Sequence, residues 1–363
     1  MKHFIKSAIL AFGLATSPAL ADVKITYGSW APDTDPASIG VEAFAKEVTE
    51  ASGGKVTFDN LYGGQIVQMR TVLPGIGEGL VDAGYVASAI YQAEMPIGSM
   101  ITNYASIQSN PYAISAAVNE TALLNCEECV AEDRANGLTT LAYAGTPHFY
   151  LMCKNPISSF KDLEGKSVRA ASANLRLAKL MGATPVNTPT TEVLEAMGRG
   201  QVECAIGSVF WLQAYSLWDE VGYVLDLPVG QYNNGNVLAM STEVWEGLDP
   251  ADQAAIKAGL PTLVAEAAAA GVAKAKEVRE ASIEKGVVWG EPTDEMRSFL
   301  NDWFVSESKT VRSLGAEKGI ANADAIASAL EESVAKWNQI VEETGGDKDA
   351  IRERMQTEIF SKL

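Results

Sequence analysis

The stretch LEGKSVRAAS, from Leu163 to Ser172, holds the feature on which the interpretation of this sequence depends. It begins with a turn at Glu164-Gly165-Lys166 and continues as a short strand that becomes small and apolar. Arg169 stands in the middle of this strand, although a guanidinium keeps its charge and is seldom buried. The strand therefore carries either a buried ion pair or a cation that is placed at a binding site.

The segments around this strand follow a β-α-β-α-β pattern that occurs twice. The first copy predicts strands at 23–30, 53–65 and 80–88 and helices at 41–51 and 67–79. The second copy predicts extended segments on both sides of Gly145-Thr146-Pro147, strands at 167–172, 184–188 and 202–208, and helices at 173–183 and 191–200. Extended runs at 222–229 and 235–241 follow, then helices at 250–285, 293–315 and 322–345. This alternation is typical of parallel α/β sheets.

Two such units predict two lobes around a cleft. We expect lobe I to comprise residues 22–146 and 236–276, lobe II residues 147–235 and 277–345, and a helical tail residues 346–363. The long helix over 250–285 would join the lobes. Ligands of open α/β sheets bind beyond the carboxyl ends of the strands, which are expected near Trp30, Tyr85, Ala171 and Ser208.

The N-terminus has the features of an export signal. Lys2 and Lys6 precede a short apolar run, and Ala19-Leu20-Ala21 fits a cleavage site, so residues 1–21 are predicted to be removed after Ala21. A retained anchor is the alternative. The chain has a formal net charge of −18, which should repel nucleic acid and anionic lipid, so any anion must be bound by local, buried geometry.

The four cysteines leave several interpretations open. Cys126 and Cys129 form a C-x-x-C in a helical stretch, which fits a redox pair, half of a metal site or a structural pair. Cys153 and Cys204 lie in predicted strands, as buried thiols or as a bridge between strands. Only His148 remains as a histidine after cleavage, so a zinc site is not expected.

The sequence lacks the common catalytic motifs. It contains no G-x-S-x-G, no Walker A loop and no H-E-x-x-H, and its acidic pairs fall in polar helical runs. We therefore expect a binding protein without cofactor, metal or catalytic residues; the alternative is an exported enzyme built on the same scaffold.

The ordered motifs resemble those of a known family. APDTDPASIGVEAFAKEV (31–48), GGKVTFDNLYGGQ (53–65), GLVDAGYVAS (79–88) and MGATPVNTPTTEVLEAMGRGQVECA (181–205) occur in sequence, together with NPISSFKDLEGKSVR (155–169), in which a D-L-x-G turn precedes a strand with one Arg. The chain resembles, over its whole mature length, an extracytoplasmic solute receptor of a tripartite ATP-independent periplasmic (TRAP) transporter, the DctP-type family.

This resemblance implies a periplasmic-binding-protein-like fold in the periplasm. It implies a receptor, expected to be monomeric, that closes on a small organic acid or zwitterion and delivers it to TRAP membrane permease subunits driven by an ion gradient. It places Arg169 as the bidentate partner of the solute's carboxylate. A receptor that hands its solute to a sensor kinase is a further alternative.

One position departs from the family pattern. Many members carry a second Arg about 20 residues before the first, where this chain has His148 and Phe149. One fixed cation beside an imidazole fits a monoanion or a zwitterion better than a dicarboxylate. His148 as a histidine of the connecting strand is the alternative.

Further candidate contacts come from aromatic and amide side chains. Each aromatic residue could instead pack between the lobes, and the amides could instead serve turn chemistry. The aromatic candidates are Trp30, Tyr85, Phe210 and Trp211, and the polar candidates are Asn233, Asn236 and, more weakly, Gln68 and Arg70.

Overall fold

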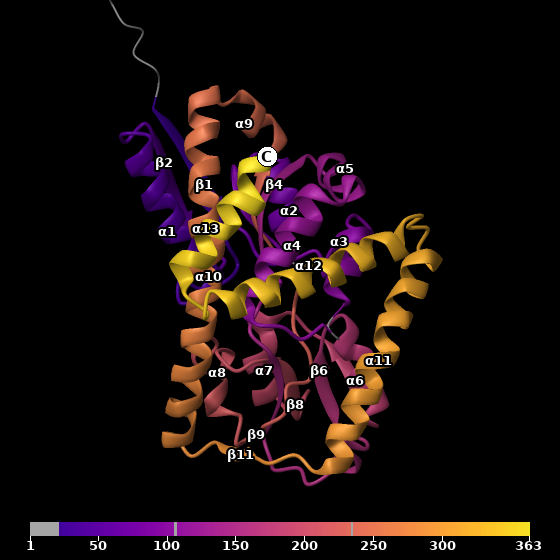
Figure 1. The fold of residues 1–363 in the computed structure, drawn as a ribbon. Coiled ribbons are helices and arrows are strands. Elements are labelled where there is room, and N and C mark those ends of the chain that lie inside the picture. The colour runs from indigo at the N-terminus through magenta and orange to yellow at the C-terminus, as the bar shows by residue number, and fades with distance from the viewer. Residues whose placement is uncertain (1–21, 105–106, 234) are drawn as a thin grey trace, which may run out of the picture.

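The computed structural model describes residues 22–104, 107–233 and 235–363. The expected signal peptide, residues 1–21, lies outside the described residues. The described chain forms two β-sheets, each covered by helices, which lie one above the other in Figure 1. This confirms the predicted two-lobed α/β fold.

The sheet of the first lobe has five strands in the order β2-β1-β3-β10-β4. Its first three strands are parallel, and β10 runs antiparallel between β3 and β4. The chain therefore builds a β-α-β-α-β unit and later adds a returning strand. The strands are β1 (Val23–Gly28), β2 (Val56–Leu61), β3 (Ala83–Val86), β4 (Leu138–Ala144) and β10 (Gly235–Ser241).

The sheet of the second lobe has six strands in the order β11-β9-β5-β8-β6-β7. Strands β8, β6 and β7 are parallel neighbours, whereas β5 is antiparallel to β8 and β9. Both sheets are thus mostly parallel, as predicted. The strands are β5 (Phe149–Cys153), β6 (Ser167–Ala170), β7 (Thr184–Asn187), β8 (Cys204–Ser208), β9 (Tyr223–Leu225) and β11 (Val288–Gly290).

Each predicted helix is present, although the one expected at 67–79 is much shorter than predicted. The predicted helix at 67–79 is only six residues long, because Pro74 lacks an amide hydrogen and fits only in a first turn, so the helix begins at Val72. The α-helices are α1 (Pro36–Ala51), α2 (Val72–Gly77), α3 (Pro96–Thr102), α4 (Pro111–Leu124), α5 (Glu127–Ala135), α6 (Ala173–Leu180), α7 (Val193–Gly198), α8 (Trp211–Ala214), α9 (Thr242–Gly247), α10 (Pro250–Glu284), α11 (Asp294–Glu317), α12 (Ala323–Glu343) and α13 (Lys348–Glu358). Short 3₁₀ turns lie at Phe160–Leu163, Thr190–Glu192, Leu217–Asp219 and Phe360–Lys362.

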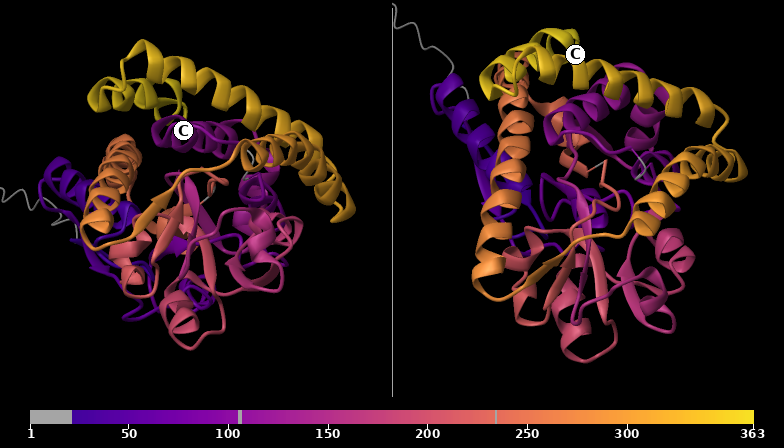
Figure 2. Two further views of the ribbon diagram at one scale, coloured as in Figure 1. Left: turned by 90° about the horizontal axis from the view of Figure 1, so that it is seen from below. Right: turned by 60° about the horizontal axis from the view of Figure 1, so that its bottom comes forward.

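Helix α10 runs along both lobes (Figures 1 and 2). Each lobe has its own hydrophobic core, called here the first and the second core. The N-terminal half of α10 packs on α1, where Gly40 lets the two helices approach closely. Val278, near the other end of α10, belongs to the second core. Where the chain first crosses between the lobes, Pro147 lies against Gly271 of α10, with a Cβ at Gly271 falling 3.0 Å from the proline ring. The helix is long and apolar enough to span a membrane, but most of its apolar window is buried in the protein, as in a core helix.

The C-terminal helices return to the first lobe (Figure 2). Helix α11 begins in the second core and reaches the first at Val311, and α12 then packs on α4. Trp337 of α12 is fully buried and donates a hydrogen bond from Nε1 to Glu120 of α4 at 2.7 Å. We therefore propose to place α12 in lobe I, which changes the boundary that we expected at residue 345.

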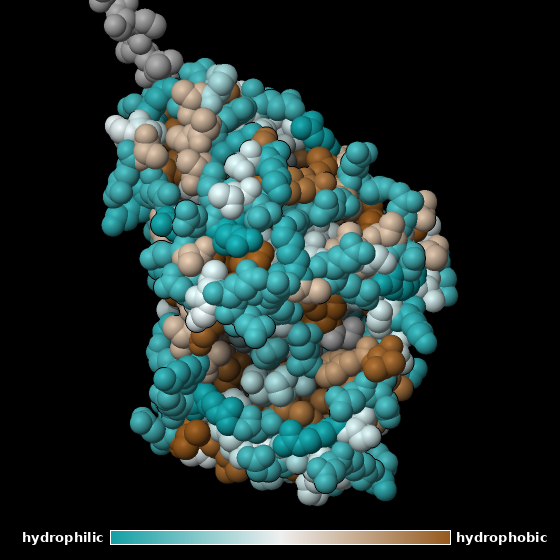
Figure 3. Space-filling model, viewed as in Figure 1, coloured by the Kyte–Doolittle hydropathy of each residue, from teal (hydrophilic) through white to brown (hydrophobic). Residues whose placement is uncertain are grey.

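The four cysteines form two disulfides. Cys126 is bonded to Cys129 at the start of α5, and Cys153 to Cys204, which are paired residues on the neighbouring strands β5 and β8. The second bridge is thus the one between strands. The face shown in Figure 3 is largely hydrophilic, with separate apolar areas, as the high net charge suggests.

Candidate ligand-binding site

The carboxyl ends of four parallel strands meet at a cavity of about 90 Å³ between the lobes. Trp30 follows β1, Tyr85 lies in β3, Arg169 in β6, and Phe210 and Trp211 follow β8, and all five line this cavity. Five of the nine predicted contact residues therefore lie together at this cavity, near the strand ends where a site was expected.

Arg169 is almost completely buried and is held by uncharged groups. Its Nε donates to the carbonyl of Thr188 at 2.8 Å, Nη1 to the carbonyl of Ile206 at 3.1 Å, and Nη2 to Thr190 Oγ1 at 3.3 Å. Burial lowers the pKa of Arg169 to about 10, and no carboxylate of the described residues is among the groups that perturb it. The side chain remains a cation at neutral pH.

The guanidinium also stacks on an indole ring. The Arg169 Cζ atom lies 5.0 Å from the centroid of the Trp211 ring, within the range of a cation–π contact. The ring fits there because residue 207 of β8 is glycine, where an added Cβ would lie 1.9 Å from a Trp211 ring atom. Phe149 packs beside Trp211, with ring centroids 5.5 Å apart.

The opposite wall consists of aromatic rings of the first lobe. Trp30 donates from Nε1 to the backbone carbonyl of Tyr85 at 2.9 Å, and the two ring centroids lie 4.7 Å apart. The Tyr85 ring occupies the space over Gly235 of β10, where a Cβ would lie 2.8 Å from it. Both walls of the cavity therefore consist of rings seated on strand glycines.

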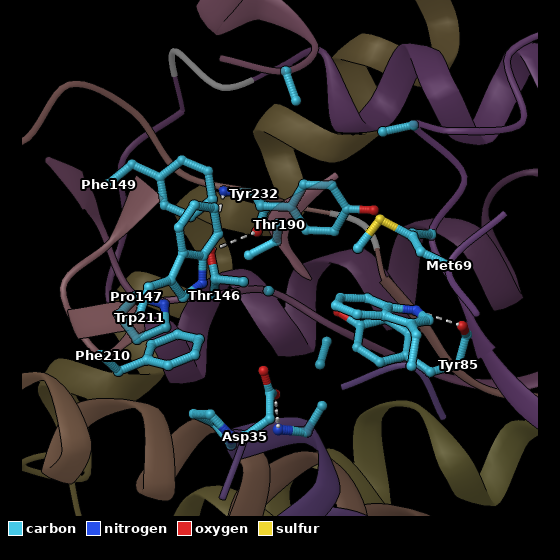
Figure 4. A pocket seen from close by; sticks show the side chains of 18 of the residues that line it. Asp35, Met69, Tyr85, Thr146, Pro147, Phe149, Thr190, Phe210, Trp211 and Tyr232 are labelled. Carbon is cyan, nitrogen blue, oxygen red and sulfur yellow. Dashed lines mark hydrogen bonds between the residues drawn. The ribbon is translucent and has the colours of Figure 1, made fainter. Parts of the chain in front are cut away.

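Asp35 is the acidic residue of the cavity lining, and we did not predict it. It is buried at the N-cap of α1, where Oδ1 accepts a hydrogen bond from the amide of Ala37 at 2.9 Å. Burial raises the pKa of Asp35 to about 6. In Figure 4 its carboxylate points into the space between the ring groups of Trp211 and Tyr85.

The two segments that connect the lobes near the cavity, around Thr146 and around Tyr232, are hydrogen-bonded to each other. The Thr146 amide donates to the Tyr232 carbonyl at 2.9 Å, and Gln231 Nε2 donates to the Thr146 carbonyl at 2.6 Å. Thr146, Pro147, Tyr215 and Tyr232 also line the cavity, with Met69, Phe149 and Thr190 (Figure 4).

His148 and Gln68, which we predicted as contacts, do not line this cavity. Residues along an extended chain point alternately to opposite sides, so Pro147 and Phe149 face the cavity and His148 does not. Burial lowers the pKa of His148. Gln68 is exposed, and its Nε2 donates to the Gly64 carbonyl in a turn.

Asn233 and Asn236 are also outside the cavity. Both are fully buried in the first lobe, where Asn233 Nδ2 donates to the Tyr104 carbonyl at 2.6 Å and Asn236 Nδ2 donates to Thr140 Oγ1 at 3.2 Å. Their amides serve the internal structure. The alternative that we weighed for them was turn chemistry, whereas these hydrogen bonds join distant segments of the lobe.

The cavity residues that we missed carried weak signals. Asp35 precedes Pro36, and that pair was interpreted only as a helix start, which it is. Thr190, Tyr215 and Tyr232 lie in turns and irregular segments, where the sequence has no period that predicts direction. Among the described residues no cluster of His, Cys, Asp and Glu has the geometry of a metal site.

Comparison with known proteins gives consistent matches. The family model described as bacterial extracellular solute-binding protein, family 7, matches residues 27–304. An uncharacterized protein, YiiZ, of Salmonella typhimurium is 23% identical over 296 residues, which cover 77% of this chain and 85% of that protein.

Solved structures of TRAP periplasmic solute-binding proteins share the fold. A marine metagenome protein specific for aromatic acids, solved with metahydroxyphenylacetate, has a TM-score of 0.76 at 15% identity, covering 87% of this chain and 100% of its own. A Bordetella bronchiseptica protein with bound mandelate has a TM-score of 0.74 at 18% identity, covering 86% and 99%. A Haemophilus influenzae protein with bound L-gulonate has a TM-score of 0.73 at 18% identity, covering 86% and 100%.

Proposed function

Because the chain belongs to the family 7 bacterial extracellular solute-binding proteins, we propose that it is the periplasmic receptor of a TRAP transporter. In this proposal it binds a small organic carboxylate in the cavity between the lobes and delivers it to a membrane permease. Arg169 is the residue that holds the carboxylate.

The observation that carries this proposal is the environment of Arg169. A guanidinium has five N–H donors, and the three hydrogen bonds of Arg169 use one each on Nε, Nη1 and Nη2. One donor therefore remains on each terminal nitrogen, which is the arrangement that a two-oxygen acid group accepts. The rest of the lining is mostly apolar, so the contact would form in a medium of low polarity.

The buried cation also requires an anionic partner. Burying a charge without a partner costs several kcal/mol, and Arg169 has only neutral acceptors and the Trp211 ring among the described residues. A carboxylate ligand would balance this charge. The similar structures with mandelate, metahydroxyphenylacetate and L-gulonate hold acids, which supports an acid as the class of ligand.

The test is a thermal-shift screen of carboxylates, with the matching primary amides as neutral controls. A ligand that binds only the folded state raises the melting temperature, and we expect acids to do so and amides not. Arg169→Gln should remove the response. Arg199→Gln, which changes an exposed arginine of the same lobe, should respond like the wild type. An equal response of Arg169→Gln would disprove the carboxylate role.

Delivery and location require separate experiments. We expect uptake of the bound acid by vesicles that contain the cognate permease only when this receptor and an ion gradient are both present. We also expect the protein in the periplasm, with Asp22 as the first residue in its mass spectrum. Recovery of the solute unchanged after incubation would separate this role from that of an exported enzyme.

A further inference from the structure

The cavity contains a buried carboxylate as well as a buried guanidinium, one from each lobe. Asp35 comes from the loop before α1 in the first lobe and Arg169 from β6 in the second, and both line the same space. We propose that the natural ligand is a zwitterion, whose carboxylate binds Arg169 and whose protonated nitrogen binds Asp35. This inference rests on the proposed function and specifies the ligand class of that site.

The first argument is that the two charged residues line the same cavity without forming an ion pair. Asp35 raises the pKa of Tyr215 and Arg169 lowers it, so both charges act on this one cavity residue, whose pKa is raised chiefly by its burial. The ion pairs formed within the described chain include neither Asp35 nor Arg169, and the partners of Arg169 there are neutral. A ligand with two opposite charges can fill the gap and neutralise both groups.

The second argument is that capping a helix does not explain the charge of Asp35. The cap uses Oδ1 alone, and Ser, Thr or Asn at this position would accept the same hydrogen bond without burying a charge. In the described chain no donor reaches the other oxygen, and Figure 4 shows the carboxylate directed into the cavity. An ammonium N–H is the donor that such an oxygen lacks.

The third argument concerns the walls and the field of the protein. A protonated nitrogen on Asp35 would lie among aromatic rings, whose faces attract cations. The net charge of −18 repels free anions at long range but exerts no net force on a neutral zwitterion. Both features favour a dipolar ligand over a simple anion.

The experiment uses pairs of acids that differ only in the nitrogen. These are phenylalanine and 3-phenylpropanoate, proline and cyclopentanecarboxylate, and 5-aminopentanoate and pentanoate, with dissociation constants from calorimetry on the full mature protein. In the pair that binds most tightly, we expect the dissociation constant of the amino acid to be at least tenfold lower than that of the acid without nitrogen. Asp35→Asn should reduce that preference to less than threefold, because affinity for the amino acid falls while that for the plain acid stays.

The variants are chosen so that the fold survives. Asn caps helices as well as Asp does, so Asp35→Asn should keep α1 and the melting temperature of the free protein within a few degrees or above it. Asp33→Asn removes an exposed acid two residues away and should bind both members of each pair like the wild type.

The outcomes separate this inference from the proposed function. Equal or tighter binding of the nitrogen-free acids, or a preference that Asp35→Asn leaves unchanged, would overturn the zwitterion while leaving the receptor in place. Failure of every acid to bind, with no difference between the wild type and Arg169→Gln, would instead remove the proposed function itself.

Discussion

Each lobe contributes one charged side chain to the cavity, and the two side chains are held in different ways. The second lobe supplies Arg169 from inside a sheet, held by three hydrogen bonds and an indole ring. The first lobe supplies Asp35 from a loop, held by one hydrogen bond at a helix start. The comparison shows that the cation is part of a rigid scaffold, whereas the acid depends on where α1 begins.

The same contrast holds for the covalent crosslinks. The bridge of the second lobe joins residues separated by 51 positions, and that of the first lobe joins residues separated by three. Because a crosslink that closes a longer loop removes more conformational entropy from the unfolded chain, the second lobe gains more from its bridge.

The largest expected effect tests that contrast. Replacing Cys153 and Cys204 by serine should lower the free energy of unfolding by about 4 kcal/mol, whereas the same change at Cys126 and Cys129 should cost about 2 kcal/mol. Urea unfolding followed by circular dichroism measures both. Equal losses would show that chain entropy does not distinguish the two bridges.

The next effect concerns the glycines beneath the aromatic walls. Gly207→Ala should cost about 3 kcal/mol and weaken acid binding, because its Cβ would collide with the Trp211 ring that lies against Arg169. Gly235→Ala meets Tyr85 less closely and should cost about 1 kcal/mol. Unfolding curves and calorimetry with the bound acid measure both. A larger loss for Gly235→Ala would contradict the order.

A third effect depends on pH and on Asp35. The pKa of Asp35 is raised from 3.8 to about 6, so between these values the folded protein holds a proton that the unfolded chain has released. The folded state is therefore favoured at low pH and loses this contribution as pH rises through 6. The wild type should lose about 2 kcal/mol more than Asp35→Asn between pH 4.5 and 7.

The comparison with Asp35→Asn is needed because other acids titrate in the same range. Burial also raises the pKa of Glu132 to about 7 and that of Asp133 to about 6, both in α5 of the first lobe. Their contribution is common to both proteins and cancels in the difference. Parallel pH profiles for the two proteins would mean that Asp35 is not protonated in this range.

The smallest effect tests the placement of α12. Trp337→Phe removes the hydrogen bond to Glu120, but Glu120 keeps its contact with Lys336. We therefore expect the free energy of unfolding to fall by about 1 kcal/mol. The affinity for the bound acid should not change. A change in affinity at constant stability would indicate that α12 influences the cavity.

Much of this architecture was predictable, because strands and amphipathic helices have clear periods. The strand ends near Trp30, Tyr85, Ala171 and Ser208 could be found because parallel strands end at one edge of a sheet. We assigned no helix to the region of α4, because its apolar residues surround the helix and all but a few of its side chains are buried.

The side-chain directions in the connections were less predictable. His148 lies between Pro147 and Phe149 in the sequence, yet only its neighbours line the cavity. Asn236 lies in a strand whose pairing shifts register beside it, so counting alternate residues could not place its amide. Asp35 was hidden by its second role, since capping alone accounts for an Asp before Pro.

The contact between Gly271 of α10 and Pro147 has a mechanical consequence. A helix of 35 residues is about 50 Å long, and its internal Pro261 is buried beside Leu260 and Leu263 of the first core, away from this contact. The segment between β4 and β5, where the chain first crosses between the lobes, contacts this helix at Gly271, which has no side chain. This contact therefore ties the first crossing to a helix that contributes to both cores, so a larger residue at Gly271 would push the crossing away from α10.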